Sequence, residues 1–330
     1  MENNILAVKN IKKTFRTSGG IFAAGRSIYA VNNVSFEIGE GRTRGLVGES
    51  GCGKTTVGKI ILGLEKPDSG EVSFNGKKIS GLAEKELRPV RKDLHIIFQD
   101  PFASLNPRIR VGNAIGEALK IAGAADTSSR VKDIIKEVGL PEDTYYRYPH
   151  EFSGGQRQRI CIARAIVSRP KFVVCDEPVS SLDVSVQSQI INLLKDLKDE
   201  FRLTYLFISH DLRVVKNICD SISVMYYGNI VEEGESEDIF AEPRHPYTRL
   251  LISSVPSIAT PAAGARNRAA EAGKKEKSAP GRALHRNSEI EKGCAFYSRC
   301  LLRQNRCAGN IPELRDTGRG HKAACFLQEK

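Results

Sequence analysis

The octapeptide GESGCGKT, residues 48–55, fits the phosphate-loop pattern G-x-x-x-x-G-K-[ST]. It follows an apolar run, TRGLV, and precedes a helical stretch, TTVGKIILGL. Glycines let the backbone wrap closely around phosphates, while exposed N–H groups and the helix dipole attract the anion. The sequence therefore predicts a strand, a phosphate-binding loop and a helix in succession, as in an α/β fold.

Two side chains of this loop are expected to act directly on the phosphates and their metal ion. Lys54 would neutralise β- and γ-phosphate oxygens, and the Thr55 hydroxyl would bind Mg²⁺. Oxidation of Cys52 could block the nucleotide. The expected ATP-binding residues around the loop are Gly48, Glu49, Ser50, Gly51, Cys52, Gly53, Lys54, Thr55 and Thr56.

Residues 1 to about 240 alternate short β-rich runs with helical stretches. The runs are TRGLV, DLHIIF, KFVVC, LTYLFI and SISVMYY, and the helical stretches include 54–64, 184–201 and 211–219. This alternation indicates a largely parallel sheet covered by helices. Between roughly 100 and 165 the sequence loses strand character and contains Pro and Gly breaks. A helical subdomain inserted into the α/β core is expected there.

The rest of the chain divides into a linker and a small tail. Residues 257–292 are rich in Ala, Gly, Lys and Arg with little apolar periodicity, which predicts a flexible, solvated linker. The predicted parts are thus an ATPase domain at 1–256, this linker, and a cysteine-bearing tail at 293–330. No apolar stretch approaches the about 18 residues of a spanning helix, and the start lacks a secretory-signal layout. A cytoplasmic location is expected.

The segment KFVVCDEP, residues 171–178, is an apolar strand that ends in two carboxylates. Burial alone would penalise both charges heavily, which favours a functional role over an ordinary strand end. Asp176 is placed to hold Mg²⁺ through water, and Glu177 to orient and deprotonate the attacking water. Beside a phosphate loop, this pair predicts hydrolysis of a nucleoside triphosphate.

A second anion site is predicted where FSGGQ, at 152–156, opens the helical run GQRQRICIARAI. Ser153 and the backbone N–H groups of Gly154, Gly155 and Gln156 lie at this helix N-terminus, where the helix dipole favours negative charge. Two phosphate-binding helix starts in one chain suggest that ATP lies between two subunits.

Two more polar residues, Gln99 and His210, each follow an apolar strand, in HIIFQD and LFISHD. His210 would contact the γ-phosphate, and Gln99 could reach Mg²⁺ or the attacking water. A single His or Gln at a strand end is often structural, so both assignments depend on the neighbouring motifs.

Together these motifs resemble those of ABC-transporter ATPases, over about residues 1–255. The resemblance implies a P-loop, RecA-like core with an inserted helical subdomain, ATP and Mg²⁺ as ligands, and a dimer as the hydrolysing unit. It also implies that Tyr29 stacks on adenine, with a core tyrosine as the alternative, and that Asp183 links the two nucleotide sites. The resemblance rests on motifs that occur here in the same order and at about the same spacing as in that family: the phosphate loop, Gln99, SGGQ, Asp176-Glu177, Ser181-Leu182-Asp183 and His210.

Two further segments, FQDPFASLNPR at 98–108 and RHPYTRLL at 244–251, look like the subgroup serving oligopeptide, dipeptide and related importers, nickel importers included. The resemblance implies two transmembrane permease subunits, a second ATPase subunit that is identical or paralogous, and, indirectly, a peptide-binding protein. In that family the helical subdomain docks a coupling helix of the permease. The chain is therefore expected to be peripheral, on the cytoplasmic face of the membrane.

Four of the eight cysteines lie in the tail, separated by five, six and seventeen residues: Cys294, Cys300, Cys307 and Cys325. These gaps are wider than the closely paired ligands of most zinc modules, and four thiolates also suit an iron–sulfur cluster. The pattern resembles the cysteine-rich end of peptide-importer ATPases, some of which hold a 4Fe-4S cluster. Zinc and free thiols are the alternatives. The linker is expected to separate the tail from the nucleotide site, so hydrolysis should survive loss of these cysteines.

The net charge of +11 would also suit a soluble ABC ATPase of nucleic-acid repair or translation. Those proteins typically carry a long coiled-coil insertion, zinc modules or two ATPase units. This sequence has one unit and no such heptad run, so no nucleic-acid partner is expected. A scaffold that binds ATP without hydrolysing it is a second alternative, against which Glu177, Gln99 and His210 together argue. The predicted function is therefore ATP hydrolysis that powers the import of peptides, and the exact ligand, a dipeptide, an oligopeptide or nickel, is left open.

Overall fold

The computed structural model describes residues 4–17, 26–121, 123–124, 126–254 and 292–328. The expected linker at 257–292 lies outside the described residues apart from position 292. None of the described helices has both the length and the apolar composition needed to cross a membrane.

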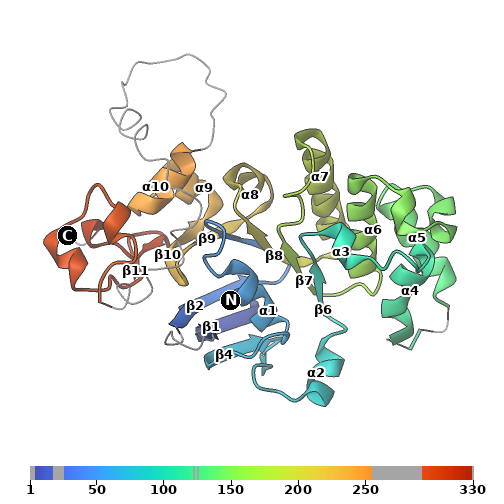
Figure 1. Ribbon diagram of the computed structural model, residues 1–330, viewed down its shortest axis with the longest axis horizontal. Helices are drawn as coiled ribbons and strands as arrows, with labels where there is room; N and C mark the ends of the chain where they lie inside the picture. Colours follow the sequence, from blue (N-terminus) through green and yellow to red (C-terminus); the bar gives the residue numbers. More distant parts are fainter. Residues whose placement is uncertain (1–3, 18–25, 122, 125, 255–291, 329–330) are drawn as a thin grey trace, which may run out of the picture.

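An eight-stranded sheet forms the centre of the molecule, in the order β11-β12-β10-β9-β3-β8-β7-β6 (Figure 1). Strands β6, β7, β8, β3 and β9 run parallel to one another, whereas β10, β12 and β11 are joined by antiparallel pairing. The predicted α/β class is confirmed. The strand bounds are β3 Thr43–Val47, β6 Leu94–Ile97, β7 Phe172–Asp176, β8 Thr204–Ser209, β9 Ser221–Tyr226, β10 Asn229–Glu235, β11 Arg315–Asp316 and β12 Lys322–Ala323.

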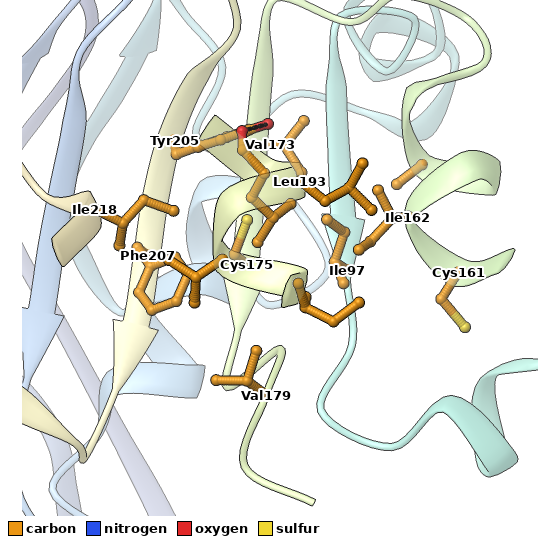
Figure 2. Packing of buried hydrophobic residues seen from close by; sticks show 14 of the residues in the cluster. Ile97, Cys161, Ile162, Val173, Cys175, Val179, Leu193, Tyr205, Phe207 and Ile218 are labelled. Atoms are coloured by element: carbon orange, nitrogen blue, oxygen red, sulfur yellow. Dashed lines mark hydrogen bonds between the residues drawn. The ribbon is translucent and has the colours of Figure 1, made fainter. Parts of the chain in front are cut away.

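Both faces of the parallel strands are buried, because their side chains alternate between two hydrophobic layers. In β7, Val173 and Cys175 belong to the layer drawn in Figure 2, while Phe172 and Val174 belong to the other. All four side chains are 0% exposed. Full burial of such a side chain stabilises the fold by roughly 1.5–3 kcal/mol. The strand is therefore a rigid support for the carboxylates at its end.

A second, antiparallel sheet, in the order β2-β1-β4-β5, packs over the phosphate-loop helix α1 (Lys54–Ile61). Val57, Ile60 and Ile61 of α1 share one hydrophobic layer with residues of this sheet and of the central sheet. The helix is thus held between two sheets. The bounds are β1 Asn4–Thr17, β2 Arg26–Gly39, β4 Ser69–Phe74 and β5 Lys77–Lys78.

Helices cover the opposite face of the central sheet, where α6, α7 and α8 contribute to the other hydrophobic layer. Between β6 and β7 the described residues form helices α3 to α6 and two 3-10 turns, at one end of the molecule (Figure 1). The helix bounds are α2 Glu84–Val90, α3 Pro101–Ser104, α4 Val111–Ile121, α5 Ser128–Glu137, α6 Gly154–Ile166, α7 Val184–Phe201, α8 Leu212–Ile218, α9 Ser236–Ala241 and α10 Pro246–Ser253.

The described part of the tail, residues 292–328, packs at the other end of the molecule, beside α10 and β10 (Figure 1). Strand β12 pairs with β10 and so extends the central sheet. His321 Nε2 lies 2.7 Å from Glu232 Oε1, and both side chains are buried. Phe296 packs against the rings of Tyr226 and Tyr247, with centroids 5.3 and 5.5 Å away. The tail is therefore an integral part of the fold.

Candidate nucleotide site

The phosphate loop joins β3 to α1 and has a backbone shape that requires glycine. Gly53 caps α1 with φ +108°, in the left-handed region that favours glycine. A Cβ atom there would lie 1.9 Å from the carbonyl oxygen of Ala30 on β2. The second sheet thus touches the loop directly and fixes its path.

Lys54 is the first residue of α1, and its side chain is buried inside the loop, with 4% of the residue exposed. Its Nζ donates hydrogen bonds to the carbonyl oxygens of Gly48 at 2.8 Å and Glu49 at 2.9 Å. The ammonium therefore lies in the concavity of the loop, where an anion would meet it. The neighbouring Cys52 thiol is buried too, and burial raises its pKa, which disfavours the reactive thiolate.

Thr55 and Asp176 meet across the space between α1 and the end of β7. The Thr55 hydroxyl donates to Asp176 Oδ1 at 3.1 Å. Burial raises the pKa of Asp176, and the nearby Glu177 carboxylate raises it further. A cation would favour the charged carboxylate, and a hydroxyl with a single carboxylate is an oxygen-ligand set that Mg²⁺ accepts together with substrate phosphates. These two residues fit the expected metal.

Glu177 follows Asp176 and is the meeting point of three strand ends. Its Oε2 lies 3.2 Å from Gln99 Nε2, beyond β6, and 3.1 Å from His210 Nδ1, beyond β8. The backbone of Glu177 has φ +47°, which is uncommon for a residue other than glycine, and its N–H donates to Ile208 O at 3.0 Å. Glu177 therefore contacts both of the other residues expected to be catalytic, at the carboxyl edge of the parallel sheet.

A cavity of about 470 Å³ opens beside these residues. Tyr29 lines it and is 40% exposed, as is Phe15, at 41%, on the paired strand β1. Sequence reasoning missed Phe15, although an aromatic residue in an otherwise polar segment was an available signal. The full lining is Phe15, Ile28, Tyr29, Ala30, Ser50, Gly51, Gly53, Lys54, Thr55, Thr56, Gln99, Glu177, Tyr227 and Gly228.

The second predicted anion site lies elsewhere, at the start of α6. Ser153 Oγ accepts from the Gln156 N–H at 3.4 Å, and the Gln156 side chain accepts from the Ser153 N–H at 3.0 Å, which is a capping box. Asp183 is exposed at the start of α7. None of Ser153 to Gln156, nor Asp183, is among the cavity-lining residues. Within this chain the structure does not bring them to the phosphate loop.

Comparisons with known proteins agree with this geometry. The model of the ABC transporter family matches residues 31–180, and that of the oligopeptide/dipeptide transporter C-terminal region matches 231–307. The oligopeptide transport ATP-binding protein AppF of Bacillus subtilis is 43% identical over 99% of this chain and 98% of its own length. The chain belongs to the ATP-binding subunits of ABC transporters. The oligopeptide transport ATP-binding protein OppF of Haemophilus influenzae, 43% identical, covers 97% of this ABC ATPase and 93% of its own chain.

Similarity to solved structures also places the fold among ABC-type ATP-binding cassettes. A dimeric ATP-binding cassette in a post-hydrolysis state, bound to ADP and Pi, superposes with a TM-score of 0.63 and 31% identity. It covers 70% of this ABC ATPase and 98% of its own chain. The predicted enzyme class, an ABC-type ATPase, is therefore confirmed, and the match to a transporter C-terminal region argues against the nucleic-acid alternative.

The expectation that the tail stands apart from the nucleotide site is wrong. Arg299 of the tail forms two hydrogen bonds to the Glu49 carboxylate in the phosphate loop, Nη1 to Oε2 at 2.8 Å and Nη2 to Oε1 at 2.9 Å. The backbone N–H of Glu49 donates to the Tyr247 hydroxyl at 3.0 Å. The sequence did not indicate this contact, because its partners are 250 positions apart.

The four tail cysteines lie near one another, but a metal site is not evident. Burial raises the pKa of the Cys294 thiol to about 11, and the other three thiols add to the effect. The pKa values of Cys300 and Cys325 are raised by burial and by Cys307. Across the described residues, no three His, Cys, Asp or Glu side chains are grouped so that they could hold a metal ion. The predicted iron–sulfur cluster and the zinc alternative thus gain no support from the geometry.

Proposed function

We propose that this ATPase powers the import of dipeptides or oligopeptides across the cytoplasmic membrane. The observation that carries the proposal is the contact of Gln99 and His210 with Glu177 beside a phosphate loop, which is an arrangement suited to hydrolysis rather than to binding alone. The peptide substrate is inferred from the names of the relatives and from the matched C-terminal region.

Each residue of the cavity has a proposed role in the reaction. Lys54 and the loop N–H groups bind the β- and γ-phosphates, and Thr55 and Asp176 hold Mg²⁺, which would neutralise developing charge on the phosphates. Glu177 orients and deprotonates the attacking water. Gln99 and His210 hold the Glu177 carboxylate in place. Gln99 would also bind Mg²⁺, and His210 would contact the γ-phosphate.

Adenine binding and dimerisation complete the proposed site. Tyr29, together with Phe15, offers an exposed aromatic surface to the base. Ser153 and the N–H groups that follow it would bind the γ-phosphate held by a second ATPase subunit, since they lie outside the cavity of their own chain. Asp183 would connect the two sites, and the partner is an identical or paralogous chain.

The helical end of the molecule is the proposed contact for the coupling helix of one permease subunit, and the transporter would contain two such subunits. Helix α3 begins two residues after Gln99, and Arg164 of α6 donates to the Ser104 carbonyl oxygen of α3. A change at Gln99 during hydrolysis would therefore move α3 and α6 together. The subunit would be peripheral, on the cytoplasmic face, and a peptide-binding protein would deliver the substrate to the permease.

Transport is tested by reconstituting the protein with its two permease subunits in lipid vesicles. Uptake of a labelled dipeptide or tetrapeptide should require ATP and should be abolished by Glu177→Gln in the ATPase subunits. ATP-driven uptake of nickel without peptide uptake would contradict the proposed substrate class. ATP hydrolysis without uptake of either ligand would contradict the transport role.

The two-subunit site is tested with Ser153→Arg and a matched control, Ser129→Arg, which changes an exposed serine in the first turn of α5. With a non-hydrolysable ATP analogue and Mg²⁺, light scattering should show dimers for the wild type and for Ser129→Arg. Ser153→Arg should bind the analogue as a monomer. Dimerisation of Ser153→Arg would refute the shared site.

For the tail we propose the iron–sulfur cluster in preference to a single zinc ion. The proposal rests on the number and type of the ligands: four cysteines lie within one small module, and four thiolates are the usual ligand set of a four-iron cubane. Anaerobically purified protein should be brown with about four irons per chain. The colour should disappear in Cys300→Ser. Colourless protein with one zinc per chain would show that the tail holds zinc in place of the cluster. Protein free of metal under anaerobic conditions would show that it holds neither.

A further inference from the structure

A carboxylate in a phosphate loop is electrostatically unfavourable for the binding of an anionic nucleotide. Glu49 is the second residue of the loop, and a negative charge so close to a bound triphosphate would repel it. The Arg299 guanidinium faces this carboxylate with both terminal nitrogens, at 2.8 and 2.9 Å. A paired fork of this kind combines charge neutralisation with a fixed geometry.

The position of Arg299 is fixed by the packing of the tail on the core. Arg299 ends the 3-10 turn η4 (Tyr297–Arg299), and the preceding Phe296 is 3% exposed. The guanidinium lies over the rings of Tyr226 and Phe296, 5.8 and 5.7 Å from their centroids. Tyr247 packs against the same rings and also accepts from the Glu49 N–H. One aromatic group thus holds both the arginine and the loop residue.

We propose that Arg299 is a positioning residue of the nucleotide site, which neutralises Glu49 so that the phosphate loop accepts ATP. The C-terminal module then supplies part of the ATP site from outside the ATPase core. This inference rests on the proposed role of the loop in binding ATP. It gives the tail a function in the hydrolysis cycle that does not depend on whether the cysteines hold a metal.

The expected effect is moderate, because both side chains are 42% exposed and solvent screens their interaction. Arg299→Gln should raise the KM for ATP roughly three- to fivefold and leave kcat close to the wild-type value. Arg299→Lys keeps the charge but loses the fork, and should have an intermediate KM. Arg315→Gln removes an arginine paired with Glu313 inside the same module and should leave KM unchanged.

The deciding variant is the double substitution Glu49→Gln with Arg299→Gln. If Arg299 acts by neutralising Glu49, removing the carboxylate as well should return the KM for ATP to within about twofold of the wild-type value. An arginine that only attaches the tail to the core would show no such rescue. Thermal melting of each variant, measured alongside, reports the attachment of the tail independently of ATP.

The outcomes separate this inference from the proposed function. An unchanged KM in Arg299→Gln, or a raised KM that the double variant fails to restore, would overturn the role of Arg299. Wild-type protein that binds no Mg-ATP in an equilibrium titration would instead overturn the proposed function. If Arg299→Gln does not fold, the comparison of Arg299→Lys with the Glu49→Gln/Arg299→Lys pair decides in the same way.

Discussion

The two halves of the central sheet serve different purposes. In the parallel half, Gln99, Glu177 and His210 follow the ends of strands β6, β7 and β8, and the Glu177 carboxylate lies within 3.2 Å of the side chains of the other two. In the antiparallel half, β10 carries Glu232 and Glu233, and both carboxylates bond to the tail, through His321 and Lys322. One half gathers reactive groups at its carboxyl edge, and the other attaches a module along its length.

This difference follows from strand direction. The carboxyl ends of parallel strands come together at one edge, so short loops there converge on one point. In antiparallel pairs, neighbouring strands end at opposite edges of the sheet, so their contacts are spread along the strands and do not converge on one point. Substitutions of the polar residues at the carboxyl edge of the parallel half should therefore alter turnover and spare stability, and substitutions of the β10 residues that contact the tail should do the reverse.

The largest expected effect is on turnover, in Glu177→Gln. Loss of the general base should lower kcat at least about 10²-fold, while Mg-ATP affinity and thermal stability stay near wild-type values. Steady-state hydrolysis, nucleotide titration and melting curves check the three quantities. A turnover near the wild-type value would exclude Glu177 as the base, and a large fall in stability would break the proposed division between the halves.

A large effect on affinity is expected for Gly53→Ala. The left-handed φ and the contact at 1.9 Å with Ala30 O would force the loop to move, which should weaken ATP binding at least about tenfold. Gly51→Ala is a matched control, because Gly51 has φ +80° but a Cβ atom there would meet nothing within 4 Å. Equal losses in the two variants would show that backbone strain, not the contact with β2, decides the loop shape.

In the antiparallel half, Glu232→Gln should destabilise the protein by about 1–3 kcal/mol, since the buried His321 would lose a charged partner. Urea unfolding measures this loss, and limited proteolysis shows whether the tail is released. Glu313→Gln, at an exposed tail carboxylate, is the control and should change little. A fall in kcat of Glu232→Gln comparable to that of Glu177→Gln would contradict the comparison.

The smallest effect concerns pH. Burial lowers the pKa of His245 to about 4, below its ordinary value of about 6.5. The unfolded chain therefore binds more protons than the folded one between these values, and stability falls as the pH drops below about 6.5. His245 caps α10 by accepting from the Tyr247 N–H, and Asn can take over that role.

His245→Asn should therefore reduce the stability lost between pH 7 and pH 5 by about 1–2 kcal/mol relative to wild type. The half-buried His95 also has a pKa lowered by burial, contributes a loss of the same sign in both proteins and cancels from the comparison. Denaturant unfolding at the two pH values measures the difference. Identical pH dependence in both proteins would show that His245 is already protonated or solvated in the fold.

Much of the nucleotide site was predictable because each part is local in sequence. Asp176, Glu177, Gln99 and His210 each follow an apolar run directly, and the loop has a fixed spacing of glycines. Knowing that the strands are parallel was enough to expect their ends to meet. The comparisons add the family to which these motifs belong.

What the sequence did not predict depends on contacts between distant positions. The four-stranded sheet that packs over α1, and with it Phe15, pairs segments whose alternation is broken by register shifts in β1. Arg299 is one of 50 Lys and Arg residues, and nothing around it distinguishes it from a solvated charge. Its partner is defined only by the docking of the tail, which itself depends on β12 joining β10.

The pairing of β12 with β10 affects how readily this edge of the sheet can pair with another chain. The N–H of Ala324 donates to the Val231 carbonyl oxygen at 2.8 Å, and β12 pairs with Glu232 and Glu233 in the middle of β10. A chain cut before the tail would leave β10 as a bare edge, with unpaired peptide groups open to any other strand. The two-residue strand β11 that borders the intact sheet offers far less for another chain to add to. The tail therefore shields part of β10 from pairing with a strand of another chain, and chains shortened before the tail should aggregate more with rising concentration than the full-length protein does.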